Sequence, residues 1–408
     1  MEENQIKIPE GWKEKEIGKL IKERKKSHLK VSDAANFGQY PFFTSGEAVL
    51  SHTHDLIDNE NIFLATGGVA NIKYFNGKAA YSTDTYTITT SEEVDTQYLF
   101  FELLNIIEYI NVNYFQGSGL KHLQKKDLKK HIILYPEEII EQRQINKILS
   151  QINETISQTE QLISKYNRIK IGLMQDLLSK GIDENGNIRS EATHKFKDSP
   201  LGRIPEEWEV GKLEIYCERI GDGTHASVRF SENEEIPFLF VSCIKPFKID
   251  FEKKASISNS EYELISKGKD TTVGTVLYSL VGSYGNAVTL INNQKLSFQR
   301  HIGFIETKRE LIDPRFLTLF LNSNFGRKQA NDLAVGNAQK TITLSALRNY
   351  CFVKPKLNEQ LRIINYYNSI ENQIVAINNE CSKFHSLKIG LMQDLLSGKV
   401  RVNHLIKE

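Results

Sequence analysis

Cysteine is scarce in this chain of 408 residues, and long apolar runs are absent from its sequence. The four cysteines, Cys217, Cys243, Cys351 and Cys381, are isolated, and none has the Cys-x-x-Cys spacing of a zinc site or of a disulfide framework. No apolar run approaches the roughly 18 residues of a membrane span, and the opening segment Met1–Asn4 does not resemble a signal peptide. We therefore expect a cytoplasmic protein without structural zinc.

Motifs of catalysis are also missing from the sequence. We find no Gly-x-x-x-x-Gly-Lys phosphate loop and no Asn/Asp-Pro-Pro-Tyr/Phe motif of an adenine methyltransferase, so neither ATP hydrolysis nor methyl transfer is indicated. The segment Phe251–Lys254 is better explained as a charged turn than as a nuclease motif, and the two histidines of Ser51–Asp55 lack a third metal ligand. We therefore expect no catalytic residue, no metal and no cofactor held by this chain itself.

Net charge gives little indication of a partner. The chain has 52 Lys and Arg residues against 51 Asp and Glu residues, which leaves a formal charge of +1. Positive charge is nevertheless concentrated in residues 22–30 and 121–131. Each of these runs fits a solvated surface as well as it fits a nucleic-acid contact, so charge alone does not decide between them.

The sequence contains an internal duplication. Ten identical residues, KIGLMQDLLS, occur at Lys170–Ser179 and again at Lys388–Ser397. The pentapeptide IPEGW at Ile8–Trp12 returns as IPEEW at Ile204–Trp208. Repeats in the same order predict that the chain is built from two copies of one unit.

A third pair of landmarks lies before each decapeptide. The segment GSGLKHLQKKDLKKHIILYP ends at Pro136, and GNAQKTITLSALRNYCFVKP ends at Pro355. A Glu-Gln pair follows each proline, at Glu141-Gln142 and at Glu359-Gln360. The middle parts of the two halves have diverged while these landmarks have not.

A heptad pattern of apolar residues follows each proline and predicts two long helices of about 40 residues. A helix with a single apolar stripe needs a partner, and the simplest partner is the duplicate, so we predict an antiparallel coiled coil. The predicted interface consists of Ile145, Leu149, Ile152, Ile156, Ile163, Tyr166, Leu173 and Leu177 in the first helix, and Ile363, Tyr367, Ile370, Ile374, Ile377, Phe384, Leu391 and Leu395 in the second.

The ends of these helices have recognisable signals. Pro136 and Pro355 suit a first helical turn, where a missing N–H costs little, and Gly181 suits a position just after a helix. Lys170 and Lys388 fall at matched positions of the seam. They either fix the register of the two helices, or they lie at the edge of the seam with their ammonium groups reaching the solvent.

The two middle parts indicate mixed α/β structure. Asn61–Thr89 and Thr275–Glu306 alternate short apolar runs with glycine turns, and helical segments follow at 96–109 and 313–324. The glycines after the first strands are either hairpin turns or loops that come close to a phosphate. The fold class is therefore α/β (α+β), with two globular domains joined by two long helices in a pseudo-two-fold arrangement.

This order of landmarks resembles the specificity subunit of type I restriction–modification enzymes over almost the whole chain. IGDGTH at Ile220–His225 and IPFLFVSCI at Ile236–Ile244 are typical of the start of a target recognition domain, and LVGSYG and SFQRH (Ser297–His301) are typical of its middle. The first half has GQYPFFTSG at Gly38–Gly46 and STDTYTI at the corresponding places. Such differences are what two domains reading different bases would show.

The resemblance implies a non-catalytic DNA-binding subunit that reads a bipartite, asymmetric target in double-stranded DNA, one half-site per domain. The helices would set the spacer and dock two copies of an adenine methyltransferase subunit. S-adenosylmethionine, ATP and Mg²⁺ would be bound only by that subunit and by the restriction and translocase subunits. Two alternatives remain open at this point: a specificity subunit of a type IIB-like enzyme, and a coiled-coil protein-interaction scaffold.

The resemblance also implies domain boundaries. We expect target recognition domain 1 at 1–136, the central helix at 137–181, a connector at 182–203, target recognition domain 2 at 204–355, the C-terminal helix at 356–399 and a tail at 400–408.

Candidate DNA contacts come from matched positions and from loops. Lys121 and Lys340 occupy the same place in the two repeats, beside a glycine turn, and we assign both to phosphates. The other candidates are Gly67, Asn71, Lys73, Tyr74, Ser118 and His122 in the first half, and Thr224, His225, Ser283, Tyr284, Gln299, Arg300, His301 and Gln339 in the second.

Overall fold

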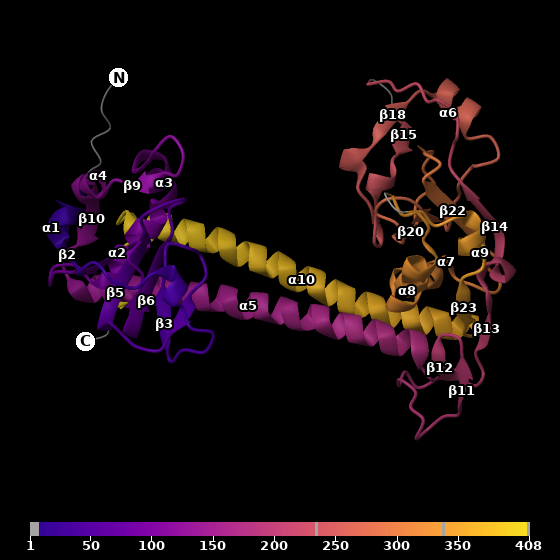
Figure 1. Cartoon of the computed structure of the whole chain (residues 1–408), viewed down its shortest axis with the longest axis horizontal. Helices are drawn as coiled ribbons and strands as arrows, with labels where there is room; N and C mark the ends of the chain where they lie inside the picture. The colour runs from indigo at the N-terminus through magenta and orange to yellow at the C-terminus, as the bar shows by residue number, and fades with distance from the viewer. Residues whose placement is uncertain (1–7, 233–235, 337–338, 406–408) are drawn as a thin grey trace. The chain divides into compact units, whose positions relative to one another are not determined.

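The computed structural model describes residues 8–232, 236–336 and 339–405 (Figure 1). The opening segment Met1–Asn4 lies outside the described residues, and so do Asn337 and Ala338 of the second glycine–lysine turn. The chain divides into two compact units, one made of Met1–Leu162 and Ile377–Glu408, the other of Ile163–Ala376. Each unit therefore contains one of the diverged middle parts and a portion of both long helices. Within the described ranges, no helix combines the length and the apolar character needed to span a bilayer.

The first unit contains a six-stranded sheet in the order β2-β7-β5-β6-β3-β4, in which only the β3–β6 pair is parallel. Helix α2 packs on β5 and β6 in the main core of this unit. The elements are β1 (Trp12–Glu16), α1 (Ile17–Leu20), β2 (Ile21–Glu23), β3 (Tyr40–Phe43), β4 (Leu50–His52), β5 (Ile57–Ala65), β6 (Ile72–Tyr81), β7 (Thr85–Thr90), α2 (Thr96–Asn105), α3 (Ile107–Asn113), β8 (Phe115–Gln116), β9 (His122–Leu123), α4 (Lys125–Lys130) and β10 (Ile132–Pro136).

The second unit repeats four neighbouring strands of this sheet, counted from its β2 edge. Its four-stranded sheet has the order β14-β22-β19-β20, which matches β2-β7-β5-β6 strand for strand. A separate sheet, β18-β15-β21, belongs to the diverged part. The elements are β11 (Phe196–Ser199), β12 (Gly202–Pro205), β13 (Glu209–Lys212), β14 (Cys217–Asp222), β15 (Ile236–Leu239), β16 (Ile244–Lys245), β17 (Lys248–Ile249), β18 (Ala255–Ile257), α6 (Asn259–Ile265), β19 (Val276–Ser279), β20 (Ala287–Thr289), β21 (Ser297–Phe298), β22 (Ile302–Thr307), α7 (Pro314–Asn322), α8 (Asn324–Leu333), α9 (Leu344–Arg348) and β23 (Cys351–Lys354).

Two long helices, α5 (Ile139–Ser179, 41 residues) and α10 (Leu357–Leu396, 40 residues), follow the two domains. The placement of the prolines in the first helical turn is wrong. Pro136 is the last residue of β10 and pairs with Trp12 of β1, and Pro355 comes directly after β23. The reason is that strand pairing continues up to each proline, so the helices begin only a few residues later.

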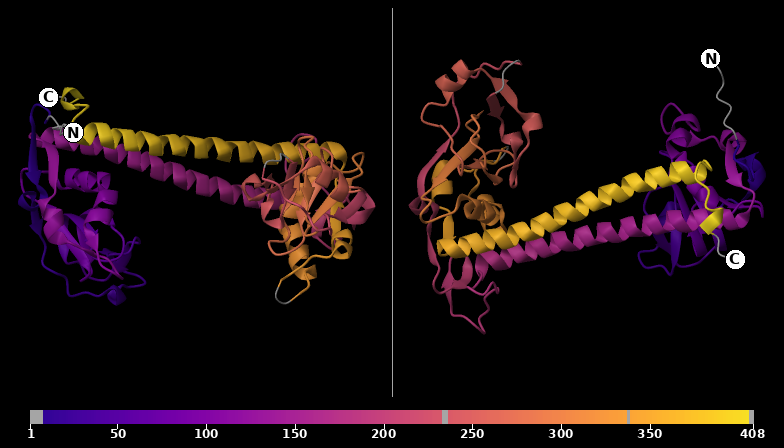
Figure 2. Two further views of the ribbon diagram at one scale, coloured as in Figure 1. Left: turned by 90° about the horizontal axis from the view of Figure 1, so that it is seen from above. Right: turned by 180° about the vertical axis from the view of Figure 1, so that it is seen from behind.

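The long helices pack antiparallel, as the heptads predict, and Figure 2 shows them running alongside one another. In the first unit Ile145 near the start of α5 shares a core with Leu395 near the end of α10. In the second unit Leu177 near the end of α5 shares a core with Ile363 near the start of α10. Lys170 donates to Glu371 at 2.9 Å across the second unit's helix pair. This ion pair favours the register role of the seam lysine.

The predicted seam residues are all at least half-buried. Most of those near the helix ends are fully buried, and Ile163, Tyr166, Leu173, Ile370, Ile377, Phe384 and Leu391 are of intermediate exposure. Along the middle turns, buried residues such as Ile156 and Ile374 alternate with these partly exposed ones.

A buried ion pair fixes the end of α5 in the second unit. The guanidinium of Arg189 donates to both carboxylate oxygens of Glu359, which lies in the first turn of α10, and the indole N–H of Trp208 donates to the same carboxylate at 3.2 Å. Gly181 ends α5 with a φ of +68°. A Cβ at Gly181 would collide with both Glu359 and Trp208, so only glycine fits there.

The first unit repeats this anchor at the end of α10. Arg401 donates to both oxygens of Glu141 at 2.7 Å, and its guanidinium lies 6.0 Å from the ring of Trp12. Gly398, with a φ of +71°, lies against the Trp12 ring. The tryptophan of each Ile-Pro-Glu-x-Trp motif also shares a core with leucines of a decapeptide, Trp208 with Leu177 and Leu178, and Trp12 with Leu395 and Leu396.

The glutamines of the Glu-Gln pairs also have matched contacts. Gln142 donates to the carbonyl of Pro136 at 2.8 Å and accepts from the N–H of Asp95 at 2.7 Å. Gln360 donates to the carbonyl of Pro355 at 2.9 Å and accepts from the N–H of Asp313 at 2.9 Å. Asp95 and Asp313 cap α2 and α7, the helices that follow the last strand of the main sheet in each domain. Each glutamine thus joins a long helix to its domain.

We predict that Arg189→Ala destabilises the start of α10 by about 3 kcal/mol, because it leaves the buried Glu359 carboxylate without its partner. The measurement is hydrogen exchange of the α10 amides at 360–367. Arg203→Ala is the matched control, since Arg203 pairs with Glu191 at the exposed surface of the same unit and such pairs contribute little. Equal loss of protection in the two variants would contradict a structural role of the buried pair.

Candidate nucleic-acid interface

One contact between two loops occurs in both domains. In the first domain the N–H of Gly68, after β5, donates to the carbonyl of Lys121 at 2.9 Å. In the second domain the N–H of Gly282, shortly after β19, donates to the carbonyl of Lys340 at 3.3 Å. Both lysine side chains are exposed. The backbone therefore holds the two lysines at equivalent places beside a glycine turn.

The lysine loop itself depends on a glycine in each domain. Gly117 has a φ of +150° and Gly336 a φ of +102°. A Cβ would come within 2.6 Å of the carbonyl oxygen of Leu120 in the first case, and within 2.7 Å of that of Gln339 in the second. Only glycine lets the loop fold back on itself so tightly.

The first domain brings some of its predicted contacts together. Gly67 forms an isolated β-bridge with His122, and the side chains of Ser118 and His122 are exposed. Asn71 is half-exposed just before β6, and its carbonyl accepts from the N–H of Ala65 at 2.9 Å. The glycine turn and the lysine loop therefore form one continuous surface.

Two other predicted contacts of this domain already have partners inside it. The ammonium of Lys73 donates to the carbonyls of Thr44 and Gly46. The hydroxyl of Tyr74 donates to Glu60 at 3.0 Å, and its ring lies 5.6 Å from that of Phe100 on α2. These contacts give both side chains a structural role in the domain.

The fold brings together the two basic runs, residues 22–30 and 121–131. The sequence alone did not decide whether they form a solvated surface or a nucleic-acid contact. Burial lowers the pKa of Lys125, the carboxylate of Glu23 raises it, and the positive charges of Lys26 and Lys129 lower it. The Lys125 ammonium also lies 4.3 Å from the centre of the Tyr86 ring. Residues of both runs therefore form one basic cluster, and its members are too far apart in the sequence for any local pattern to reveal it.

The second domain gathers its candidates around the end of β14. The N–H of Thr224 donates to the carbonyl of Phe298 at 2.9 Å, and the N–H of Arg300 donates back to the carbonyl of Thr224 at 3.0 Å. Gln299 forms a bridge with Thr224. His225 pairs with Asp222 at 2.8 Å. The motifs IGDGTH and SFQRH thus meet in space.

His301 connects this group to the glycine turn. Its carbonyl accepts from the N–H of Leu280 at 2.9 Å, two residues before Gly282. Burial lowers the pKa of His301, and the positive charges of Arg300 and His225 lower it further. The three basic side chains therefore lie close enough to act on one another, and the His301 ring is biased towards its neutral form.

The other candidates of the second domain lie in the two loops. The carbonyl of Ser283 accepts from the hydroxyl of Ser279 at 2.7 Å, and the hydroxyl of Tyr284 donates to Asn331 at 3.0 Å. The amide nitrogen of Gln339 lies 3.5 Å from the place that a Cβ on Gly282 would take. Gln339 is therefore adjacent to the glycine turn, whereas Tyr284 is directed towards α8.

The corresponding turn of the first domain has different chemistry. Residues 82–84, between β6 and β7, are Ser82, Thr83 and Asp84, where the second domain has Gln299, Arg300 and His301 before β22. The first domain thus has the carboxylate of Asp84 in the turn where the second domain has the basic side chains of Arg300 and His301. One framework presents two different polar surfaces.

Comparison with known proteins identifies the framework. The family model described as "Type I restriction modification DNA specificity domain" matches residues 9–168 and 205–383. The chain is 27% identical over 422 residues to the type I restriction enzyme MjaVIII specificity subunit of Methanocaldococcus jannaschii, covering 98% of this chain and 95% of that protein. It is 27% identical over 215 residues to the EcoDI specificity subunit of Escherichia coli, covering 50% of this chain and 48% of that protein.

Solved structures share the fold. The S subunit of a type I restriction-modification system from M. genitalium has a TM-score of 0.61 at 15% identity, covering 97% of this chain and 98% of that chain. A chain from a study of complex assembly and conformational transition of the type I R-M system has a TM-score of 0.59 at 17% identity, covering 97% and 100%. Because the family model matches most of its length in two segments, this chain belongs to the type I restriction modification DNA specificity family and carries that domain twice.

Proposed function

We propose that the two domains of this specificity subunit, residues 1–136 and 204–355, each read one half of a bipartite, asymmetric target in double-stranded DNA. The observation that carries the proposal is the duplicated loop contact between Gly68 and Lys121 and between Gly282 and Lys340. It offers the same phosphate-binding group beside two surfaces of different chemistry. Phosphate contacts fix position, and base contacts give specificity.

The variable surfaces are the proposed base readers. Arg300 is exposed beside His301 in the second domain, and an arginine can donate two hydrogen bonds to guanine in the major groove. Thr83 and Asp84 take this place in the first domain, and a carboxylate accepts from cytosine instead. The two domains would therefore favour different half-sites.

We assign the long helices, expected at 137–181 and 356–399, to two further tasks: setting the unread spacer and docking two copies of an adenine methyltransferase subunit. Restriction and translocase subunits would complete the complex, and S-adenosylmethionine, ATP and Mg²⁺ would be bound by these partners. The connector 182–203 and the tail 400–408 carry the arginines that fix the helix ends. Helices α5 and α10 are unbroken over 41 and 40 residues, as a spacer element requires.

Exposed apolar side chains support a partner that binds twice. Ile171 is 57% exposed in the first decapeptide, and its counterpart Ile389 is 59% exposed in the second. Ile169 and Leu387, two residues earlier in each copy, are also exposed. Neither pair is explained by the contacts that the chain makes with itself. Apolar patches at matched positions of the two repeats fit two copies of one partner subunit.

Exchange of residues 20–135 for those of a relative with another specificity tests the modular assignment. We expect one half of the methylated motif to change and the other half to stay, because each domain carries its own base-reading surface. The measurement is the adenine methylation pattern of cells that contain the chain and its modification subunit. A change in both halves, or in neither, would sink the assignment.

Lys121→Ala and Lys340→Ala should each weaken DNA binding about equally for all sequences and reduce the salt slope by about 1, since each removes one phosphate contact. The measurement is a binding isotherm at several salt concentrations on target and non-target duplexes. Lys121→Arg and Lys340→Arg, which keep the charge, are the controls. A loss confined to one base pair would instead assign the lysine to base reading.

Ile171→Asp should remove one methyltransferase subunit from the complex, and the double variant with Ile389→Asp should remove both. The new carboxylate would be buried in an apolar contact without a partner, so the affinity for the methyltransferase subunit at that patch should fall at least about tenfold. Light scattering of the assembled complex measures the stoichiometry. Val112→Asp, at a 71% exposed position on α3, is the control and should leave two subunits bound. Loss of both subunits from the single variant would contradict two separate docking patches.

A further inference from the structure

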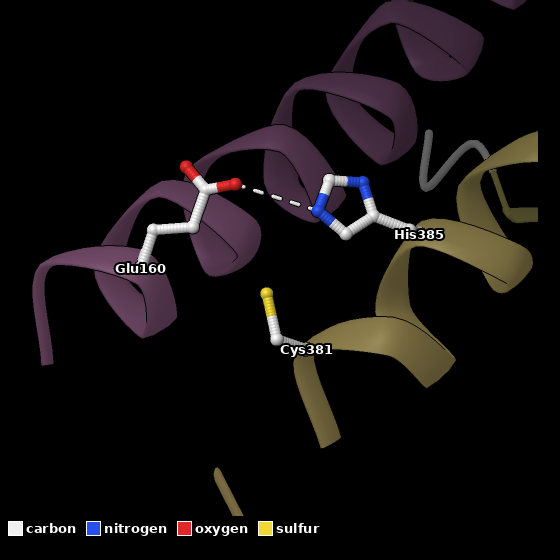
Figure 3. Close-up of side chains that lie close together, drawn as sticks. All are labelled: Glu160, Cys381 and His385. Carbon is white, nitrogen blue, oxygen red and sulfur yellow. Dashed lines mark ion pairs between the residues drawn. The ribbon is translucent and has the colours of Figure 1, made fainter. Parts of the chain in front are cut away.

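Three potential metal ligands come together where α5 and α10 pack in the first unit (Figure 3). They are Glu160 of α5 and Cys381 and His385 of α10, and one ligand atom from each lies within 4.8 Å of the other two. The carboxylate of Glu160 lies 3.4 Å from Nε2 of His385. In Figure 3 the thiol points into the space between the two helices, below the carboxylate–imidazole pair.

The helices place these groups for simple geometric reasons. Cys381 and His385 are four residues apart on one helix, so their side chains share one face. Cys381 occupies a position of the heptad seam and is only 7% exposed, and Glu160 approaches it from the facing helix. The anchor between Arg401 and Glu141 fixes the register of this helix pair. The ligand set is therefore held by the fold and does not depend on a mobile loop.

The distances suit a tetrahedral ion. Two ligand atoms that each lie about 2.0–2.1 Å from Zn²⁺ are about 3.4 Å apart at a tetrahedral angle, which is the separation of the Glu160 and His385 atoms. Because the thiol sulfur lies within 4.8 Å of both other ligand atoms, it must move inward by at most about 1.3 Å to reach its usual distance of about 2.3 Å from the ion. The side chains of Glu160 and His385 are 58% and 53% exposed, so water can take the fourth position.

The chemistry of the set selects the metal. A thiolate, an imidazole and a carboxylate together favour Zn²⁺ and its close analogue Co²⁺ over Mg²⁺ and Ca²⁺, which prefer oxygen ligands alone. Binding would release the thiol proton to solvent, because the thiolate is the ligand.

The other half of the duplication lacks these groups. The positions that correspond to Cys381, His385 and Glu160 in the repeat are occupied by Ile163, Asn167 and Asn378. An apolar residue is sufficient at the seam, so the seam itself gives no reason for a cysteine at 381. The three metal-binding groups are found together in only one of the two copies.

We propose that Glu160, Cys381 and His385 bind one Zn²⁺ ion that links α5 to α10 in the first unit. The sequence did not show this site, because its ligands come from two distant segments and none has Cys-x-x-Cys spacing. The ion would add a cross-link to a stretch of the coiled coil where Ile377 and Phe384 are only half-buried.

Cobalt titration of the full-length chain, after removal of metal with a chelator, tests the proposal. We expect one Co²⁺ per chain, with the visible absorption of a tetrahedral ion and a thiolate-to-cobalt charge-transfer band, and displacement of Co²⁺ by Zn²⁺. Cys381→Ser should abolish the charge-transfer band. Glu160→Gln and His385→Asn should each weaken binding at least about tenfold, since loss of even an outer-shell partner costs about 10- to 100-fold.

Two controls keep the result decisive. Cys351→Ser removes a thiol from the second unit and should leave the titration unchanged. Glu160 and His385 are surface residues, so their variants should keep the helical circular dichroism of the wild type, and Zn²⁺ should raise the Tm of the wild type but not of His385→Asn. A titration without a thiolate band, or equal affinity in Cys381→Ser, would overturn the site.

Discussion

The architecture depends on a buried carboxylate at the start of each long helix that must be neutralised by an arginine from beyond the end of the other. Glu359 is 3% exposed and Glu141 is 2% exposed, and an unpaired charge at that depth is costly. Arg189 comes to Glu359 only if α5 has ended beside the start of α10, and Arg401 comes to Glu141 only if α10 has ended beside the start of α5. Antiparallel pairing satisfies both requirements at once.

This constraint separates what the protein must keep from what it can change. The tryptophans, the helix-ending glycines and the Glu-Gln pairs all belong to the anchors, so a substitution at one of them affects a buried network. The loops that carry Arg300 or Asp84 are attached to the same framework through backbone hydrogen bonds, which tolerate a change of side chain. Under the proposed function, new base preferences can therefore arise in one domain while the anchors stay unchanged.

Much of the fold could be predicted because its main signals are periodic or repeated. The heptad pattern predicted the two antiparallel helices, and the repeated sequence segments predicted that the chain contains two copies of one unit. The helix starts were misplaced because Pro136 looks the same before a helix and at the end of a paired strand. The contacts of Lys73 and Tyr74 with Thr44 and Glu60 depend on tertiary placement. The same holds for the group of Glu160, Cys381 and His385, whose members no local pattern connects.

The small net charge is consistent with DNA binding, because cations that are paired inside the fold must be distinguished from cations that are exposed on the surface. Arg189 and Arg401 are held by buried carboxylates, and Arg219 pairs with Glu306 at 2.7 Å, so these cations serve the fold. Each such pair adds nothing to the net charge of +1, so that sum does not describe how the remaining charges are distributed over the surface. What a phosphate backbone would meet is the local surface, where Lys26 and Lys125 come together from separate basic runs, while Lys129 beside them is paired with Glu23. Electrostatic affinity follows the number of phosphates that such a surface contacts, so the overall sum understates it.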